Sequence, residues 1–276
     1  TSEGKIQCHF EENMMDFPND NRLSLIQKIS EEMDGLGLES VRPAIQRHVE
    51  KTKTIKKPLD LAPLIEHTLL KPEATRRDII RLCEEAKRFH FHGVCVNPVF
   101  VKEAQKQLTG THRSVVTVVG FPLGANVTAT KVEETKHVIE LGANEVDMVI
   151  PIGALKEGDY RAVWQDIRAV VEAAGSIQLK VIIETGLLEE TEKIAACLLA
   201  ERAGAAFVKT STGFSVRGAT IEDVKLMKAV VGNGLGIKAA GGIRDFQTAR
   251  ALVDAGSTRL GCSASVAIVT ESLQIG

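Results

Sequence analysis

Short runs of β-forming residues recur along this chain at intervals of 22 to 33 residues, from about residue 63 onward. Between them lie stretches with the apolar spacing of helices, such as Thr191–Ala203 and Asp245–Ala255, each followed by a glycine. Eight such units predict an α/β fold, a closed (β/α)8 TIM barrel. The predicted strands are Leu64–Leu69, Gly93–Val96, Val115–Gly120, Glu145–Ile150, Gln178–Glu184, Ala206–Thr210, Leu235–Ala239 and Arg259–Cys262.

An open, doubly wound sheet is the alternative fold. It usually carries a G-x-G-x-x-G motif after its first strand, whereas the glycines here follow the late strands. The predicted barrel occupies residues 58–276, and residues 1–57 form an N-terminal extension. The stretch Asn21–Lys51 is helix-like with an interruption at Gly35–Gly37, so we expect a partly helical segment that packs against the barrel.

Composition excludes several classes of function. The chain has 34 Lys and Arg against 36 Asp and Glu, a net charge of -2, and therefore lacks the basic field that nucleic-acid binding needs. It has no apolar run long enough to cross a membrane and no targeting segment, so we expect a cytoplasmic protein. Five scattered cysteines without a C-x-x-C pair, and seven histidines without a ligand cluster, indicate neither disulfides nor a metal site.

Ionisable residues stand where the predicted strands end. Lys209 closes an apolar strand before the small-residue loop Thr210–Gly213, Lys238 has a parallel context on the next strand, and Asp147 lies in the fourth strand. Active sites of such barrels form at the carboxyl ends of the strands. A structural ion pair would explain any one of these charges, but the three together favour a catalytic site.

The two lysines indicate amine chemistry on a carbonyl. A lysine attacks only when neutral, yet its ordinary pKa leaves about one molecule in a few thousand neutral at pH 7. Ammonium groups about 5 Å apart repel each other by roughly 3 kcal/mol, which would favour loss of a proton. We therefore predict that Lys209 forms a Schiff base, that Lys238 activates it, and that Asp147 transfers protons.

Glycines after the last strands predict a phosphate site. Gly241 and Gly242 follow the seventh strand and Ser263 follows the eighth, which is where barrels commonly bind phosphate through backbone N–H groups and hydroxyls. Gly213, in the loop after Lys209, is a further candidate. Glycine pairs also mark ordinary turns, so this prediction depends on their place in the barrel.

Taken in order, these motifs resemble the deoxyribose-phosphate aldolases, which are Schiff-base aldolases built on a (β/α)8 barrel. The resemblance runs from about Leu61 to Ile268, through the segments 65–72, 94–98, 119–124, 145–147, 208–213 and 238–244. It implies reversible cleavage of 2-deoxy-D-ribose 5-phosphate to acetaldehyde and D-glyceraldehyde 3-phosphate, with no metal or organic cofactor.

The resemblance also assigns roles to residues. It implies that Lys209 is the Schiff-base lysine, Lys238 the residue that lowers its pKa, and Asp147 the proton-transfer group. Glu66 stands where these aldolases usually have aspartate. The residues expected to bind substrate or phosphate are Glu66, Thr68, Cys95, Lys180, Gly213, Gly241, Gly242 and Ser263.

Other functions remain open at this stage. The chain could be an aldolase-like barrel of low or no activity that serves as a protein-interaction module, with residues 1–57 as the docking segment. It could also be an isomerase or lyase for another sugar phosphate. A homodimer is possible, because exposed helices around a barrel often pair.

Overall fold

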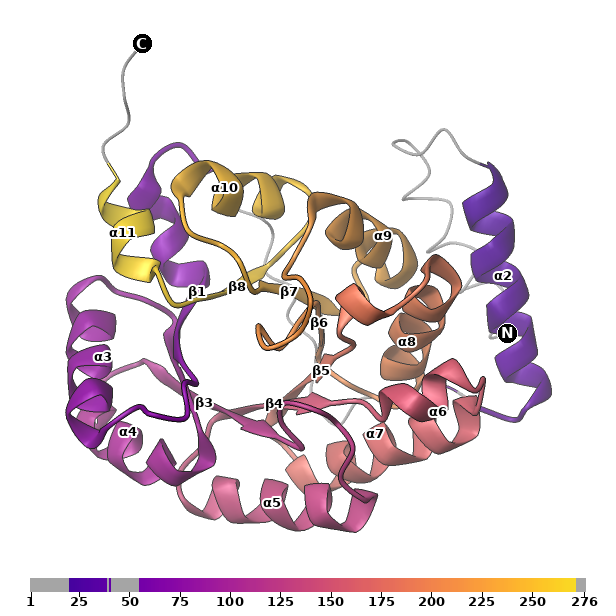
Figure 1. Cartoon of the computed structure of the whole chain (residues 1–276), viewed down its shortest axis with the longest axis horizontal. Coiled ribbons are helices and arrows are strands. Elements are labelled where there is room, and N and C mark those ends of the chain that lie inside the picture. The colour runs from indigo at the N-terminus through magenta and orange to yellow at the C-terminus, as the bar shows by residue number, and fades with distance from the viewer. Residues whose placement is uncertain (1–19, 39, 41–54, 272–276) are drawn as a thin grey trace.

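The strands of this chain close into a parallel barrel in the order β1 to β8, with β8 paired to β1 (Figure 1). The computed structural model describes residues 20–38, 40 and 55–271. The (β/α)8 barrel predicted from the sequence is confirmed. The strands are β1 Ile65–Leu69, β2 Gly93–Val96, β3 Ser114–Val119, β4 Glu145–Val149, β5 Gln178–Ile182, β6 Phe207–Lys209, β7 Gly236–Ala240 and β8 Arg259–Cys262.

Helices surround the barrel and connect its strands (Figure 1). Side-chain caps define where several begin: Thr75, Thr220 and Asp245 each accept a hydrogen bond from a backbone N–H in the first turn of the helix that follows. The helices are α3 Arg76–Arg88, α4 Val101–Leu108, α5 Thr128–Glu140, α6 Ile152–Lys156, α7 Tyr160–Ala174, α8 Glu190–Arg202, α9 Ile221–Val231, α10 Phe246–Asp254 and α11 Ser265–Thr270, with short 3-10 turns η2 Pro58–Leu64, η3 Pro98–Phe100 and η4 Thr185–Leu187.

The two faces of the strands have different chemistry. Outward-facing residues such as Val146, Val208 and Ile237 are buried with the apolar faces of the helices in one large core. Part of the inner face is apolar. Around β2 and β3, Cys95, Val116 and Val118 form a small cluster together with Leu70 and Phe121. Phe207 of β6 also faces inward, and its ring lies against Lys180 and Arg259. Charged side chains fill much of the remaining interior, so the barrel centre is built for polar chemistry.

The described part of the N-terminal extension packs on the outside of the barrel. Helix α2 (Asp20–Gly35) lies along α8 and buries Ile26 and Met33 completely. Arg202 of α8 donates a hydrogen bond to the Leu38 carbonyl at 2.7 Å. The helix ends at the predicted interruption. The remainder of the predicted stretch, from residue 41, lies outside the described residues.

The predicted fifth strand was too long. It was expected to reach Glu184, but β5 ends at Ile182. Glu184 adopts φ 58° and ψ 62°, the left-handed conformation, which breaks an extended strand.

None of the helices in the described ranges is long and apolar enough to span a membrane.

Candidate active site

Asp147, in the middle of β4, is fully buried and contacts three lysines. Its Oδ2 accepts hydrogen bonds from Lys209 Nζ at 2.8 Å and from Lys238 Nζ at 2.6 Å. Its Oδ1 accepts one from Lys180 Nζ at 3.0 Å. The structure therefore brings together the three residues predicted to be catalytic and adds Lys180, which the sequence placed among the substrate-binding residues.

Strand register produces this convergence. Lys209 of β6 is the Cα partner of Lys238 on β7, and Asp147 of β4 is the partner of Lys180 on β5. Because side chains alternate along a strand, partners in register point to the same face. The intervening residues face the helices, so these four side chains all point into the barrel.

A second set of charges continues the cluster. Glu66 of β1 contacts Lys238, and it lies 3.3 Å from Lys180 and 3.2 Å from Arg259. Glu145 of β4 lies 2.6 Å from Lys180 Nζ and 3.3 Å from Arg259. His92, directly before β2, contacts Glu145 through Nε2 at 2.6 Å.

Glu145, Arg259 and His92 were not predicted from the sequence to belong to the site. Glu145 could have been predicted, because it stands two residues before Asp147 and therefore lies on the same face of the strand. Arg259 is the register partner of Lys238. His92 has no such signal, and only the closed barrel shows that it reaches Glu145.

The charges in this cluster do not balance. Four cations face three carboxylates, and burial makes an unpaired charge expensive. Lys180 contacts all three carboxylates, and Lys238 and Arg259 contact two each. Among the carboxylates that the structure describes, Lys209 contacts Asp147 alone. It is therefore the cation with the least support from carboxylates.

The electrostatics fix the charge of the central groups. Burial would raise the pKa of Asp147, but the neighbouring Lys180, Lys209 and Lys238 outweigh it and hold that pKa well below its usual value. Burial would lower the pKa of Lys238, but Asp147 and Glu66 outweigh it and raise that pKa. Asp147 is thus a carboxylate and Lys238 an ammonium at neutral pH.

Two loops at the carboxyl ends of β6 and β7 meet through glycines. Gly241 has φ +88°, and a side chain there would lie 2.9 Å from the Gly218 Cα and 3.6 Å from the Gly213 Cα. This close approach requires glycine. Gly213 and Gly241, both predicted phosphate contacts, are therefore neighbours, and Gly242 follows with φ +78°. Gly218 was not predicted from the sequence.

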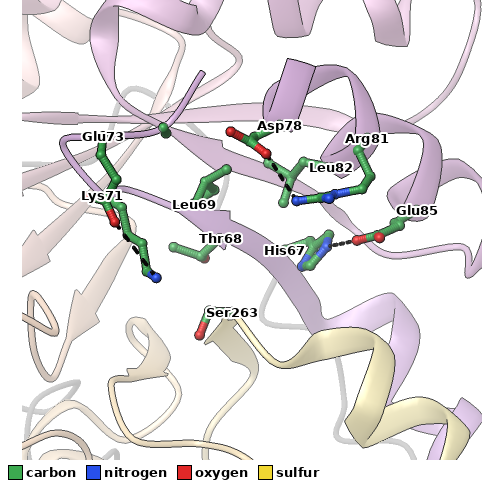
Figure 2. A pocket seen from close by; sticks show the side chains of 11 residues that line it. His67, Thr68, Leu69, Lys71, Glu73, Asp78, Arg81, Leu82, Glu85 and Ser263 are labelled. Atoms are coloured by element: carbon green, nitrogen blue, oxygen red, sulfur yellow. Dashed lines mark hydrogen bonds and ion pairs between the residues drawn. The ribbon is translucent and has the colours of Figure 1, made fainter. Parts of the chain in front are cut away.

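A pocket of about 620 Å³ opens beside the end of β1 (Figure 2). Thr68 lines it from β1 and Ser263 from the end of β8, which brings these two predicted residues into one pocket. His67 lies at its base, where it contacts Glu85 at 2.7 Å and Ser265 at 2.9 Å. Burial lowers the pKa of His67, so the pocket has a neutral imidazole at its base.

A family model described as DeoC/LacD family aldolase matches residues 60–266 of this chain. The chain is a member of this aldolase family. The resemblance found in the sequence is thereby confirmed, and the chain is a carbon–carbon lyase by membership.

Relatives of this aldolase agree with that assignment. It is 57% identical over 211 residues to the deoxyribose-phosphate aldolase of Geobacillus sp. (strain WCH70), covering 76% of this chain and 95% of the relative. A crystal structure of a putative deoxyribose-phosphate aldolase from Coccidioides immitis is 41% identical, with a TM-score of 0.79 over 89% of this chain and 97% of that one. The deoxyribose phosphate aldolase of Aeropyrum pernix, described as tetrameric, is 28% identical with a TM-score of 0.72 over 91% and 97%.

Cys95 of the aldolase faces the charged cluster from β2. Burial raises the pKa of its thiol to about 11, so it is a protonated, weakly reactive side chain at neutral pH. Its Sγ lies within 4.8 Å of carboxylate oxygens of Glu66 and Asp147, and Glu66 forms a similar group with His92 and Glu145. Sequence spacing did not predict these groups. Lysine and arginine already contact their carboxylates, so a metal ion would have to displace those cations.

Proposed function

We propose that this aldolase reversibly cleaves 2-deoxy-D-ribose 5-phosphate to acetaldehyde and D-glyceraldehyde 3-phosphate through a Schiff base on Lys209. The observation that supports this most directly is the 2.8 Å contact between Lys209 Nζ and Asp147 Oδ2 inside a buried cluster of excess positive charge. Relatives named deoxyribose-phosphate aldolase support the choice of substrate.

Lys209 is the proposed nucleophile because it has the fewest carboxylate contacts in the cluster. One lysine must lose its charge for attack, and loss of a proton here reduces the imbalance of four cations and three carboxylates. Lys238 and Lys180 have further carboxylates and stay charged. Lys238 also donates to the same Asp147 oxygen as Lys209, so Lys209 does not have that oxygen to itself.

The proposed reaction begins when the Lys209 amine attacks C1 of the open-chain sugar. The carbinolamine loses water to give a protonated imine, with Asp147 exchanging protons at the departing hydroxyl. The C3 hydroxyl then gives up its proton, the C2–C3 bond breaks, and its electron pair moves into the imine to form an enamine. D-Glyceraldehyde 3-phosphate leaves, C2 takes up a proton, and water hydrolyses the imine to release acetaldehyde.

The phosphate would bind at the glycine loops. Gly213 and Gly241 approach each other at the ends of β6 and β7, close in sequence to Lys209 and Lys238. Backbone N–H groups in such positive-φ turns suit an anion. We propose Gly213, Gly241, Gly242 and Ser263 as phosphate contacts, and Glu66, Thr68, Cys95 and Lys180 as residues that shape or charge the substrate site.

Borohydride trapping tests this function. The protein is incubated with acetaldehyde and sodium borohydride, and the peptide containing residue 209 is analysed by mass spectrometry. We expect a reduced two-carbon adduct on Lys209, lost in Lys209→Ala and retained in Lys225→Ala, which alters an unrelated lysine on α9. A folded protein without an adduct at residue 209 contradicts the proposed chemistry. Cleavage assays with the deoxy-sugar phosphate and with ribose 5-phosphate separate the proposed substrate from an oxygenated one.

Assembly and location are secondary proposals. The tetrameric relative from Aeropyrum pernix supports a homo-oligomer, for which the sequence suggested a dimer. The apolar face of α2 is buried on α8, so any partner of the extension would use its exposed face or residues outside the described ranges. A phosphorylated sugar as substrate fits the cytoplasm.

A further inference from the structure

Glu184 has an unusual backbone conformation at the end of β5. With φ 58° and ψ 62°, it is one of two non-glycine residues with positive φ in the described ranges, the other being His90. Residues with a Cβ atom avoid this region because the Cβ approaches the following carbonyl oxygen. Such strain persists where surrounding contacts enforce it, and it is common at functional sites.

The Glu184 side chain is buried, with 2% of the residue exposed, and it faces the loop that follows Lys209. Its Oε2 accepts hydrogen bonds from the Thr212 N–H at 3.0 Å and the Thr212 hydroxyl at 2.6 Å. Its Oε1 has no hydrogen-bond donor among the residues that the structure describes. A buried carboxylate oxygen without a hydrogen bond lowers stability, so a contribution to stability does not by itself explain this side chain.

The contact organises the β6–α9 loop, residues 210–220. Thr212, held by Glu184, accepts a hydrogen bond on its Oγ1 from the Phe214 N–H at 3.1 Å. Gly213 stands between these two residues and is next to Gly241. Glu184 thus fixes the turn that contains Gly213.

The rest of the β5–α8 connection supports the same loop. The Thr185 N–H donates to the Thr210 carbonyl at 2.9 Å, and Arg217 Nη2 donates to the Thr185 carbonyl at 3.1 Å. Lys209 itself is attached differently, because its carbonyl accepts from the Ile183 N–H and its ammonium binds Asp147. A change at Glu184 therefore disturbs the loop more than the nucleophile.

We propose that Glu184 is a positioning residue that holds the β6–α9 loop in the conformation that binds the substrate's phosphate group. The proposal deepens the function proposed above and rests on it for the identity of the substrate. Glu184 does not touch the reacting atoms; it acts through Thr212. Its loss should therefore weaken phosphate binding and leave Schiff-base chemistry largely intact.

Glu184→Gly is the most informative variant. Glycine accepts a positive φ without strain, which offsets part of the loss of the two hydrogen bonds to Thr212, so the protein should still fold, with a similar or modestly lower melting temperature. We expect the KM for 2-deoxy-D-ribose 5-phosphate to rise about tenfold while kcat falls less than about threefold, which corresponds to loss of uniform binding. The KM for unphosphorylated 2-deoxy-D-ribose should change much less. An equal rise in both KM values would overturn the proposal.

Four further variants provide controls. Glu184→Gln keeps the shape of the side chain and one acceptor oxygen, so its effect should be intermediate. Thr212→Ser keeps the hydroxyl and should behave almost like the wild type. Thr212→Val loses the hydroxyl bond but keeps the backbone N–H bond to Glu184, so it should raise the KM in the same direction as Glu184→Gly but by less. Glu190→Gln, which removes a nearby carboxylate that contacts Arg22 instead of the loop, should change neither KM nor kcat. Wild-type kinetics in Thr212→Val would contradict the role of Thr212.

Hydrogen exchange in the free protein tests the role of Glu184 without any assumption about the substrate. In the free protein, Glu184→Gly should speed amide exchange in residues 210–218 by about tenfold and leave β4 and β7 unchanged. Binding of inorganic phosphate, measured by calorimetry, should weaken in parallel. If the wild type fails to cleave the sugar phosphate but both effects occur, the proposed substrate is wrong and the loop role stands. If exchange and phosphate binding are both unchanged, the role of Glu184 is wrong.

Discussion

Two buried lysine sites of this aldolase differ in how their charges are matched. In the helix layer, Lys131 of α5 donates to Asp166 Oδ2 at 2.7 Å and to the Val149 carbonyl at 3.0 Å. Thr128 donates to the other Asp166 oxygen at 2.7 Å. One ammonium faces one carboxylate, and both groups form further hydrogen bonds, so this ion pair has a structural role.

In the barrel centre, by contrast, Asp147 is shared by three lysines, and Lys209 contacts no other carboxylate among the described residues. If Lys209 is the nucleophile, as we propose, burial alone does not make a lysine reactive. Both Lys131 and Lys209 are almost inaccessible to solvent. What distinguishes them is how a carboxylate is shared: among the described residues Asp166 contacts one lysine of the helix layer, Lys131, in a fully buried pair, whereas Asp147 contacts three lysines.

Replacing Lys209 should have the largest effect on activity and little effect on stability. We expect Lys209→Met to reduce aldol cleavage by roughly 10³-fold or more, since the nucleophile is lost. The free energy of unfolding should change by less than about 1 kcal/mol, because Asp147 keeps Lys180 and Lys238 as partners. Cleavage assays and urea unfolding measure the two quantities. A large loss of stability would show that Lys209 is as structural as Lys131.

The reverse pattern should follow from Lys131→Met. Asp166 would lose its only lysine partner among the described residues, so unfolding should become easier by about 3–5 kcal/mol. The kcat of the folded fraction should be unchanged. The double variant Lys131→Met/Asp166→Leu removes both charges and should recover much of the stability. A single variant as stable as the wild type would mean that the pair is unimportant.

The sequence predicted the parts of this molecule that depend on local pattern. The spacing of apolar runs indicated eight strands, and the place of Lys209, Lys238 and Asp147 in those strands indicated a shared site at the carboxyl ends of the barrel. Glu145 could have been added, because side chains alternate along a strand. His92 could not, because its partner lies on a strand 53 positions later and the contact exists only once the barrel closes.

Loop geometry was the harder part to predict. The run Gln178–Glu184 is consistent with an uninterrupted strand, and nothing in it indicates the left-handed turn at Glu184. In that conformation the Glu184 side chain accepts a hydrogen bond from Thr212, which belongs to another loop and is distant in sequence. Likewise, the glycines suggested a phosphate site, but the approach of Gly218 to Gly241 depends on how two loops fold against each other.

Lys238→Leu should change the pH at which Lys209 reacts, because it removes one of the three lysines that share Asp147. Lys209 would then keep the Oδ2 atom to itself and lose a nearby positive charge, so its charged form should become more stable. At an effective dielectric near 20, a charge about 5 Å away contributes roughly 3 kcal/mol, or about two pH units. The midpoint pH of borohydride-trapped adduct formation should therefore rise by about that amount. An unchanged midpoint would refute the proposed coupling between the lysines.

Glu66 offers the smallest effect and the finest test of charge matching. Shortening the side chain in Glu66→Asp weakens contacts to three cations, but each keeps another carboxylate: Lys238 keeps Asp147, while Lys180 and Arg259 keep Glu145. We therefore expect kcat/KM to change by less than about threefold, or about 0.7 kcal/mol. Glu66→Gln should do more, because it leaves four cations with two carboxylates. If the two variants are equally active across the pH range, the excess of positive charge does not control the activity of this site. The role of Glu66 would then be to shape the pocket at β1.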